Sequence, residues 1–316
     1  MATKSKEKFD LFQIVTDRII AQLEGGVIPW HKPWIQVSRS CDLAVSYTTG
    51  KPYSLLNQML LGEPGEYITF KQCTERGGKV KTGEKSRMVV FWKMLAKDKT
   101  DDKGNPVYGS DGKVRKEMIP LLQYYNVFHI NQCEGIEPRK RRNSKPDNAE
   151  PQTPMSPDVV AEGIITGYVD RSGVNLVHQL GNRAYYRPSS DTVVLPEFSQ
   201  FKQLAEYYST AFHELTHSTG HHTRLNRLDK KASFGSEEYS KEELVAEIGA
   251  SALVNHVGLE TEASFQNNAA YVQNWLKALK DDKRLIVSAS GRAEKAVNMI
   301  LGIEPKKYSA EEEPNE

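Results

Sequence analysis

Apolar side chains recur at steps of three and four residues through the first predicted helix, residues 8–24. They are Phe9, Phe12, Val15, Ile19 and Leu23. This is the period of one helix face, and the pair Gly25 and Gly26 ends the segment. The same kind of pattern predicts further helices at 53–61, 199–219, 241–257 and 269–280.

Short runs of β-forming residues lie between these helices. Strands are predicted at 79–80, 88–92 and 124–130, with an exposed loop or hairpin over 98–116. Residues 159–169 are expected to run from a helix into a strand. Thr192–Leu195 are expected to form an edge strand because Pro196, which cannot donate to a ladder, ends it. The mixture predicts an α+β fold.

A change of composition divides the chain. Residues 137–158 hold five prolines and almost no apolar side chains, which is typical of a flexible linker. We therefore predict an N-terminal domain at 1–137, a linker at 138–158, a second domain at 159–305 and an acidic tail at 306–316. Two domains also suit a length of 316 residues.

The overall composition is that of an ordinary globular protein, with 38% hydrophobic and 26% charged residues. No apolar run reaches the roughly 20 residues of a membrane span, and residues 1–12 contain no long apolar region of the kind expected in a secretion signal. We expect a cytoplasmic protein that does not contact a membrane. The three cysteines show no C-x-x-C spacing, so the sequence indicates neither a disulfide framework nor a thiolate zinc site and favours buried positions.

Charge is distributed unevenly between the two halves. Residues 1–150 carry 25 Lys and Arg against 18 Asp and Glu, whereas the remainder carries 17 against 23. A basic first half is compatible with a polyanionic partner such as nucleic acid.

The stretch HELTH, residues 213–217, carries the most specific chemistry. On a helix, His213 and His217 lie one turn apart on one face, where two imidazoles can bind one zinc ion. Glu214 is then placed to act as the general base for a metal-bound water.

A catalytic zinc needs a third protein ligand, and two schemes offer one. A histidine six residues after His217 would complete the first scheme, but Thr223 stands there and a hydroxyl is a poor ligand. The second takes a glutamate from a later helix, and Glu243 is our choice, with Glu247 one turn further supporting His213. Glu242 faces another side of that helix and is the less favoured candidate. Tyr185 and Tyr186 are candidates to bind the oxyanion or the substrate.

Two groups of motifs resemble one known family. The segments IPWHKPW, TTGKPYSLLNQMLL and YITFKQCTERGGKVKTGEKSRMVVFWK resemble the N-terminal domain of ArdC-type antirestriction proteins, a domain shared with TraC-type plasmid primases. YYRPSSDTVVLPEF, HELTHSTGHHTRLNR and YSKEELVAEIGASAL resemble the zincin-like metallopeptidase domain that accompanies it. The resemblance covers nearly the whole chain except the linker and the tail.

This resemblance implies that the first domain binds single-stranded DNA, the second binds Zn²⁺ or another divalent metal such as Mn²⁺, and the protein protects incoming DNA from restriction in the bacterial cytoplasm. A peptidase would also need a protein substrate, such as a restriction protein or another host protein on the DNA. Single-strand binding combines cations with exposed rings for stacking. The candidates are Trp30, Trp34, Tyr53, Phe70, Lys71, Lys79, Lys81, Lys85, Arg87 and Trp92.

Three functional hypotheses are open at this point. In the first, DNA binding localises a metallopeptidase. In the second, coating of the strand is the function and the metal site is structural or vestigial. Glu214 favours the first, because a structural site needs no base. A nuclease or primase accessory is the least favoured, since the first half has no acidic polymerase cluster.

Overall fold

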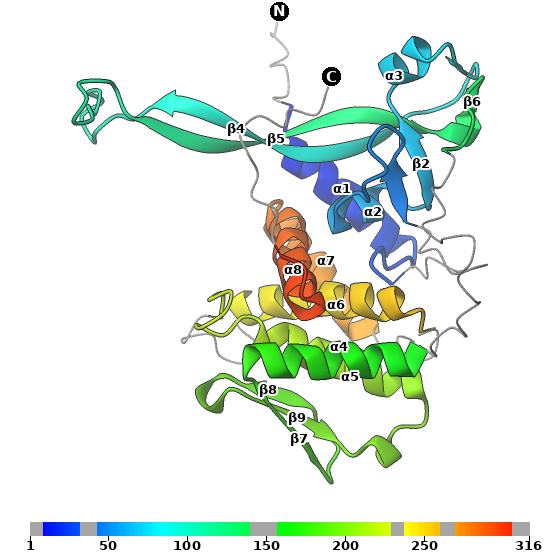
Figure 1. Ribbon diagram of the computed structural model, residues 1–316, viewed down its shortest axis with the longest axis vertical. Coiled ribbons are helices and arrows are strands. Elements are labelled where there is room, and N and C mark those ends of the chain that lie inside the picture. The colour runs from blue at the N-terminus through cyan, green and yellow to red at the C-terminus, as the bar shows by residue number, and fades with distance from the viewer. Residues whose placement is uncertain (1–8, 32–42, 140–156, 229–236, 260–268, 305–316) are drawn as a thin grey trace, which may run out of the picture.

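The computed structural model describes residues 9–31, 43–139, 157–228, 237–259 and 269–304. It confirms a two-domain α+β architecture (Figure 1). Trp34, Cys41, most of the predicted linker and the predicted acidic tail lie outside the described residues. None of the described helices is both long enough and apolar enough to cross a membrane.

Within the described residues, the first half combines three α-helices with two sheets. Its elements are α1 (Leu11–Glu24), β1 (Ala44–Ser46), α2 (Leu55–Leu61), β2 (Gly65–Ile68), α3 (Phe70–Glu75), β3 (Lys79–Val80), β4 (Arg87–Asp98), β5 (Lys116–His129) and β6 (Cys133–Glu134). One sheet has the order β1-β2-β5-β4, with β1 parallel to β2 and the other pairs antiparallel. β3 and β6 form a separate antiparallel pair.

β4 and β5 are much longer than the sequence pattern predicts. They pair from Arg87 opposite Val127 to Asp98 opposite Lys116 and extend beyond the body of the molecule as a ribbon (Figure 1). The predicted loop at 98–116 is therefore only the tip of this ribbon. The outer part was missed because its apolar residues are exposed on both faces and show no clean alternation.

The second half is mainly helical. Its elements are α4 (Pro157–Ser172), β7 (Asn175–Gln179), β8 (Tyr185–Arg187), β9 (Thr192–Pro196), α5 (Leu204–Ser218), α6 (Glu237–Val257), α7 (Ala269–Asp281) and α8 (Leu285–Leu301). Helix α8 was not predicted from the sequence. The strand expected within 159–169 is wrong, because α4 continues to Ser172 and β7 begins only at Asn175.

The predicted edge position of Thr192–Leu195 is also wrong. The sheet has the order β7-β9-β8, so β9 pairs in parallel with β7 and in antiparallel with β8. Pro196 is tolerated because it lies at the end of the strand, opposite Gln179. Free edges of this sheet therefore belong to β7 and β8, not to β9.

Local signals account for several helix boundaries. Asp10 caps α1 by accepting a hydrogen bond from the backbone N–H of Gln13 at 3.2 Å. Thr69 and Gln72 form a reciprocal capping box at the start of α3. Gly62 ends α2 with φ 69°, a left-handed conformation that favours glycine.

A shared hydrophobic core joins the two halves. Val15 and Ile19 of α1 belong to the same buried cluster as Leu244 of α6, Trp275 of α7 and Ile286 of α8. Ion pairs from Lys283 to Asp10 at 2.6 Å and from Lys280 to Glu24 at 2.8 Å lie beside this contact. Helix α1 is thus anchored on the helices of the second half.

A second core holds α5 in place. Phe212 and Leu215 are fully buried against Val193 and Leu195 of β9 on one side and Leu253 of α6 on another. With the apolar face of α5 buried, the histidines of HELTH face α6.

Candidate metal centre and candidate nucleic-acid interface

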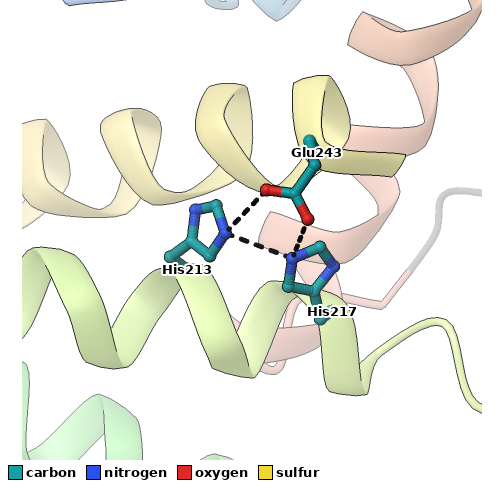
Figure 2. Close-up of side chains that lie close together, drawn as sticks. All are labelled: His213, His217 and Glu243. Atoms are coloured by element: carbon teal, nitrogen blue, oxygen red, sulfur yellow. Dashed lines mark hydrogen bonds and ion pairs between the residues drawn. The ribbon is translucent and has the colours of Figure 1, made fainter. Parts of the chain in front are cut away.

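The two histidines of HELTH lie side by side on α5. Their spacing of four residues brings the rings together, with 3.1 Å between His213 Nε2 and His217 Nε2 (Figure 2). Both Nε2 atoms therefore point toward one place, as expected from the helical period.

Helix α6 brings Glu243 to the same place. Its Oε2 lies 3.5 Å from His213 Nε2, and its Oε1 lies 3.4 Å from His217 Nε2 (Figure 2). Four-coordinate zinc holds N and O ligands at about 2.0–2.2 Å, which puts neighbouring ligand atoms about 3.4 Å apart at the tetrahedral angle. Within the described residues, these three form the group with metal-ligand spacing. Their donor set and separations fit a divalent metal.

Glu214 is buried on the same helix, with 8% of its surface exposed. Burial would lower the pKa values of His213 and His217, but the surrounding carboxylates, Glu214 among them, outweigh it and raise both pKa values. Thr223, the position required by the alternative ligand scheme, is instead hydrogen bonded through its hydroxyl to His221 Nδ1 at 2.8 Å.

A glycine sets how closely the two helices approach. A Cβ added to Gly249 of α6 would lie 2.7 Å from Thr216 Cγ2 and 2.9 Å from Thr216 Oγ1. Thr216 cannot give way easily, because it is fully buried and its hydroxyl donates to Phe212 O at 2.7 Å. Thr216 immediately precedes His217, so the absence of a side chain at Gly249 lets α5 bring the histidine up to Glu243.

We expect Gly249→Ala to destabilise the protein by about 1–3 kcal/mol through overpacking, and to weaken metal binding. Gly291→Ala in α8 is the matched control, because nothing lies within 4 Å of its added Cβ. There the better helix propensity of alanine should stabilise by roughly 1 kcal/mol. Urea unfolding of both variants tests this, and equal effects of the two substitutions would contradict the packing argument.

A carboxylate that the sequence pattern did not favour as a ligand lies at the outer nitrogen of His217. Glu242 Oε1 lies 3.2 Å from His217 Nδ1. Arg227 donates to both oxygens of Glu242, with Nε 2.9 Å from Oε2 and Nη2 2.8 Å from Oε1. Arg227 is itself held by Thr216 O and by Thr219 Oγ1. This carboxylate and arginine pair orients the imidazole; no spacing pattern in the sequence connects Arg227 to HELTH.

His213 has a different outer partner. Glu247 Oε1 lies 3.9 Å from His213 Nδ1, an ion-pair distance rather than a hydrogen bond. The other oxygen, Oε2, lies 3.7 Å from His31 Nε2 in the first half of the chain. The position of Glu247 therefore suits the supporting role that we predicted from the sequence.

The buried charges shift each other's pKa values strongly. Burial would lower the pKa of His217, but Glu242 and Glu243 outweigh it and raise that pKa to about 10. Burial would raise the pKa of Glu243, yet hydrogen bonds to His213 and His217 hold it well below its usual range. Because a metal binds the neutral imidazole, its binding must displace any proton on the histidine nitrogen that it takes.

The two candidate tyrosines have partners of their own. Tyr186 donates its hydroxyl proton to Asp191 Oδ1 at 2.7 Å, and Asp191 pairs with Arg224. Tyr185 accepts a hydrogen bond from Arg187 at 3.0 Å. Arg224 also donates to Ser218 O at 2.8 Å, so the Tyr186 network braces the end of α5.

Five of the ten candidate DNA-binding residues lie on α3, on β3 or in the turn before β4. Phe70 is 62% exposed at the start of α3, and Lys71, Lys79, Lys81 and Lys85 are exposed nearby. We define these five residues, together with the exposed Arg76 at the end of α3, as the α3–β3 surface. A small core of Ile68, Cys73, Ile130 and Cys133 supports it. Arg76, whose guanidinium lies 5.7 Å from the Tyr47 ring, was not among the predicted residues.

Other candidates are placed differently. Trp30 is 4% exposed and packs edge-on against Trp275 at 5.2 Å, so its ring cannot stack on a base. Arg87 donates to Leu61 O and to Glu63 Oε2 at 2.7 Å, and Tyr53 is half-buried against Tyr67. Trp92 is 51% exposed but lies away on β4, next to Phe12. Trp30 is therefore too buried to contact DNA and is no longer a candidate for the interface.

Two known protein families match different parts of the chain. Residues 9–128 match the N-terminal domain of anti-restriction factor ArdC. Residues 165–292 match a zincin-like metallopeptidase family. The metallopeptidase match contains the whole candidate metal centre on α5 and α6.

The structure also resembles solved structures along nearly its whole length. The Mn(II)-bound crystal structure of antirestriction ArdC protein from the R388 plasmid is 33% identical, with a TM-score of 0.69 over 93% of this chain and 98% of that chain. The chain belongs to the ArdC antirestriction family. The metal-free structure of the same R388 protein gives a TM-score of 0.67 at 32% identity, over 92% of this chain and 97% of that chain.

Other ArdC-like sequences occur as parts of larger proteins. A DNA primase TraC from Escherichia coli is 37% identical over 303 residues, which cover 93% of this chain and 20% of the primase. A second TraC from the same organism is 36% identical over 302 residues, 92% of this chain and 27% of that protein. The chain thus spans about a quarter or less of these relatives. A zincin-like domain implies a divalent metal, and the Mn(II)-bound ArdC structure fits this.

Proposed function

We propose that this ArdC-family protein binds single-stranded DNA through its first half, carries a zinc-dependent peptidase site in its second half, and protects incoming DNA from restriction in the bacterial cytoplasm. The observation that carries the peptidase proposal is the convergence of His213, His217 and Glu243 at ligand spacing, with Glu214 buried beside them. The substrate would be a protein, such as a restriction protein or another host protein on the DNA.

The chemistry would be hydrolysis of a peptide bond. A divalent ion held by His213, His217 and Glu243 would polarise the substrate carbonyl and acidify a water. Glu214 takes a proton from that water as its oxygen bonds to the carbonyl carbon. The carbon–nitrogen bond then breaks, and Glu214 returns the proton to the leaving amine. Glu242 faces Nδ1 of His217 and Glu247 faces Nδ1 of His213, and the two carboxylates orient these imidazole rings.

The sheet beside α5 supports a binding mode for an extended peptide. Because β9 is paired on both sides, a peptide strand can add only to the edge strand β7 or β8. Tyr185, on β8, stays a candidate substrate contact. Tyr186 is better explained as the partner of Asp191.

The α3–β3 surface supports the DNA-binding proposal. It combines an exposed ring at Phe70 with five cations, and unpaired strands are bound by stacking on rings and by neutralisation of phosphates. Lys71 lies on α3, Lys79 on the short strand β3, and Lys81 and Lys85 in the turn that follows it.

Replacement of Lys79, Lys81 and Lys85 by alanine is expected to weaken binding of an oligo(dT) strand. Each phosphate contact contributes about 0.7 to the salt slope for single strands, so the slope of log K against log salt should fall by roughly 2. Fluorescence anisotropy at several salt concentrations measures it.

The control is the triple alanine variant of Lys202, Lys277 and Lys295, which are exposed in the second half. It removes the same charge and should leave the slope unchanged. If both triple variants reduce the slope equally, binding follows net charge and the α3–β3 surface is not the interface.

Protection is tested by transferring unmodified DNA into restricting cells that carry each variant at equal protein level. The Lys79, Lys81 and Lys85 variant should fail to protect while it still hydrolyses peptides. Full protection by this variant would contradict the role of the α3–β3 surface. In the same assay, Glu214→Gln separates the two mechanisms: full protection without hydrolysis would assign the role to strand coating.

A further inference from the structure

Glu247 is a carboxylate with two histidine neighbours from different halves of the chain. One oxygen faces His213 Nδ1 at 3.9 Å, and the other faces His31 Nε2 at 3.7 Å. The side chains of His31 and Glu247 are 8% and 17% exposed, so water screens this contact poorly. The carboxylate that supports a candidate ligand is therefore itself held by a residue of the first half.

The position of His31 is set by the segment that follows α1. Its backbone N–H donates to Ile28 O at 3.0 Å, which forms a turn after Gly25 and Gly26. The preceding Trp30 is buried, with its ring 5.2 Å from that of Trp275 on α7 and 6.2 Å from that of His31. Burial of Trp30 between α1 and α7 thus fixes where the imidazole of His31 can lie.

We propose that His31 is a positioning residue for the metal site, acting through Glu247 on His213. This inference rests on the metal site of the proposed function. In the presence of His31, Glu247 is fixed and orients the ring of His213. Without it, Glu247 can turn toward solvent or toward the ligands themselves. On this proposal, the metal site is complete only when the segment after α1 is docked on α6 and α7. The first half of the chain is therefore part of the metal centre.

The test measures Zn²⁺ affinity of the full chain after metal removal, by competition with a chromophoric chelator at constant pH. Loss of an outer partner of a metal-binding histidine costs about 10–100-fold in affinity, and we expect His31→Ala to fall in this range. His31→Gln, whose amide nitrogen can take the place of Nε2 and donate to Glu247, should recover part of the loss. His256→Ala, an exposed histidine near the end of α6, should bind as wild type.

A double-mutant cycle tests the route through Glu247. In a Glu247→Gln background, His31→Ala should cause little further weakening, because the group through which it acts is already altered. Wild-type affinity of His31→Ala, or fully additive effects in the cycle, would overturn the inference. The unfolding midpoint of the metal-free variants is measured in parallel, because a merely structural role would lower that midpoint without changing the affinity.

The outcomes also separate this inference from the proposed function. If the wild-type chain binds no divalent metal, the metal site itself fails. If the wild type binds Zn²⁺ and His31→Ala binds it equally well, only the role of His31 fails. Should His31→Ala not fold, His31→Asn gives the answer, because its shorter amide corresponds to Nδ1 and not to the Nε2 that faces Glu247. Weaker binding than wild type supports the role, and equal binding overturns it.

Discussion

Glu214→Gln is expected to reduce peptide hydrolysis by about 10²–10⁴-fold while leaving metal affinity unchanged. The amide has nearly the same shape as the carboxylate but cannot take a proton from the attacking water. His213, His217 and Glu243 keep their positions, since Glu214 contributes no atom to the candidate ligand group. The measurement is turnover of a fluorogenic peptide library by the metal-loaded full chain, with Zn²⁺ affinity determined on the same preparation.

The matched control is Glu206→Gln, eight residues earlier on α5 and outside the candidate metal group. It makes the same chemical change on the same helix and should hydrolyse peptides as the wild type does. Binding of single-stranded DNA should be equal in all three proteins. Undiminished hydrolysis by Glu214→Gln would exclude it as the general base and leave the metal site without a catalytic assignment.

The second large effect is expected for Glu243→Gln, which replaces a candidate ligand. Zn²⁺ affinity should fall by more than the about 10–100-fold typical of an outer partner, because one of three protein donors is lost. Chelator competition with Zn²⁺ and with Mn²⁺ measures the loss for both ions. Hydrolysis should be lost in parallel at metal concentrations that saturate the wild type.

Glu242→Gln is the informative comparison, because Glu242 is the neighbouring residue and contacts the outer nitrogen of His217. It should weaken binding by only about 10–100-fold. Glu75→Gln, an exposed carboxylate on α3, should have no effect. A greater loss for Glu242→Gln than for Glu243→Gln would reverse the assignment of ligand and supporting residue.

Packing of α1 against α6, α7 and α8 joins the two halves of the chain. A linker rich in proline leaves open whether the two domains move independently. The described residues, however, share one buried cluster, two lysine–carboxylate ion pairs and the contact between His31 and Glu247 across the boundary. The division at 138–158 stays a prediction about the chain's domains. Truncation of the first half would expose Leu244, Trp275 and Ile286, so the full chain is the appropriate unit for experiments on the metal site.

The sequence pattern was most informative where structure depends on neighbouring residues. The predicted helix at 8–24 corresponds to α1, and those at 53–61, 241–257 and 269–280 correspond to α2, α6 and α7. Their apolar faces follow the helical period, which backbone hydrogen bonds impose locally. The outer ribbon of β4 and β5 and the central position of β9 were missed, because strand pairing joins residues far apart and leaves little local trace.

The same distinction holds for the metal centre. A spacing of four residues is enough to predict that His213 and His217 share a helix face. Three other contacts depend on the packing of distant segments: Glu243 meets both Nε2 atoms, the pair of Glu242 and Arg227 lies at the outer nitrogen of His217, and His31 reaches Glu247. Those contacts depend on how closely α5 and α6 approach at Gly249 and on where Trp30 is buried. Packing between distant segments sets both the approach of the two helices and the position of Trp30. Such packing leaves no periodic pattern in the amino-acid sequence.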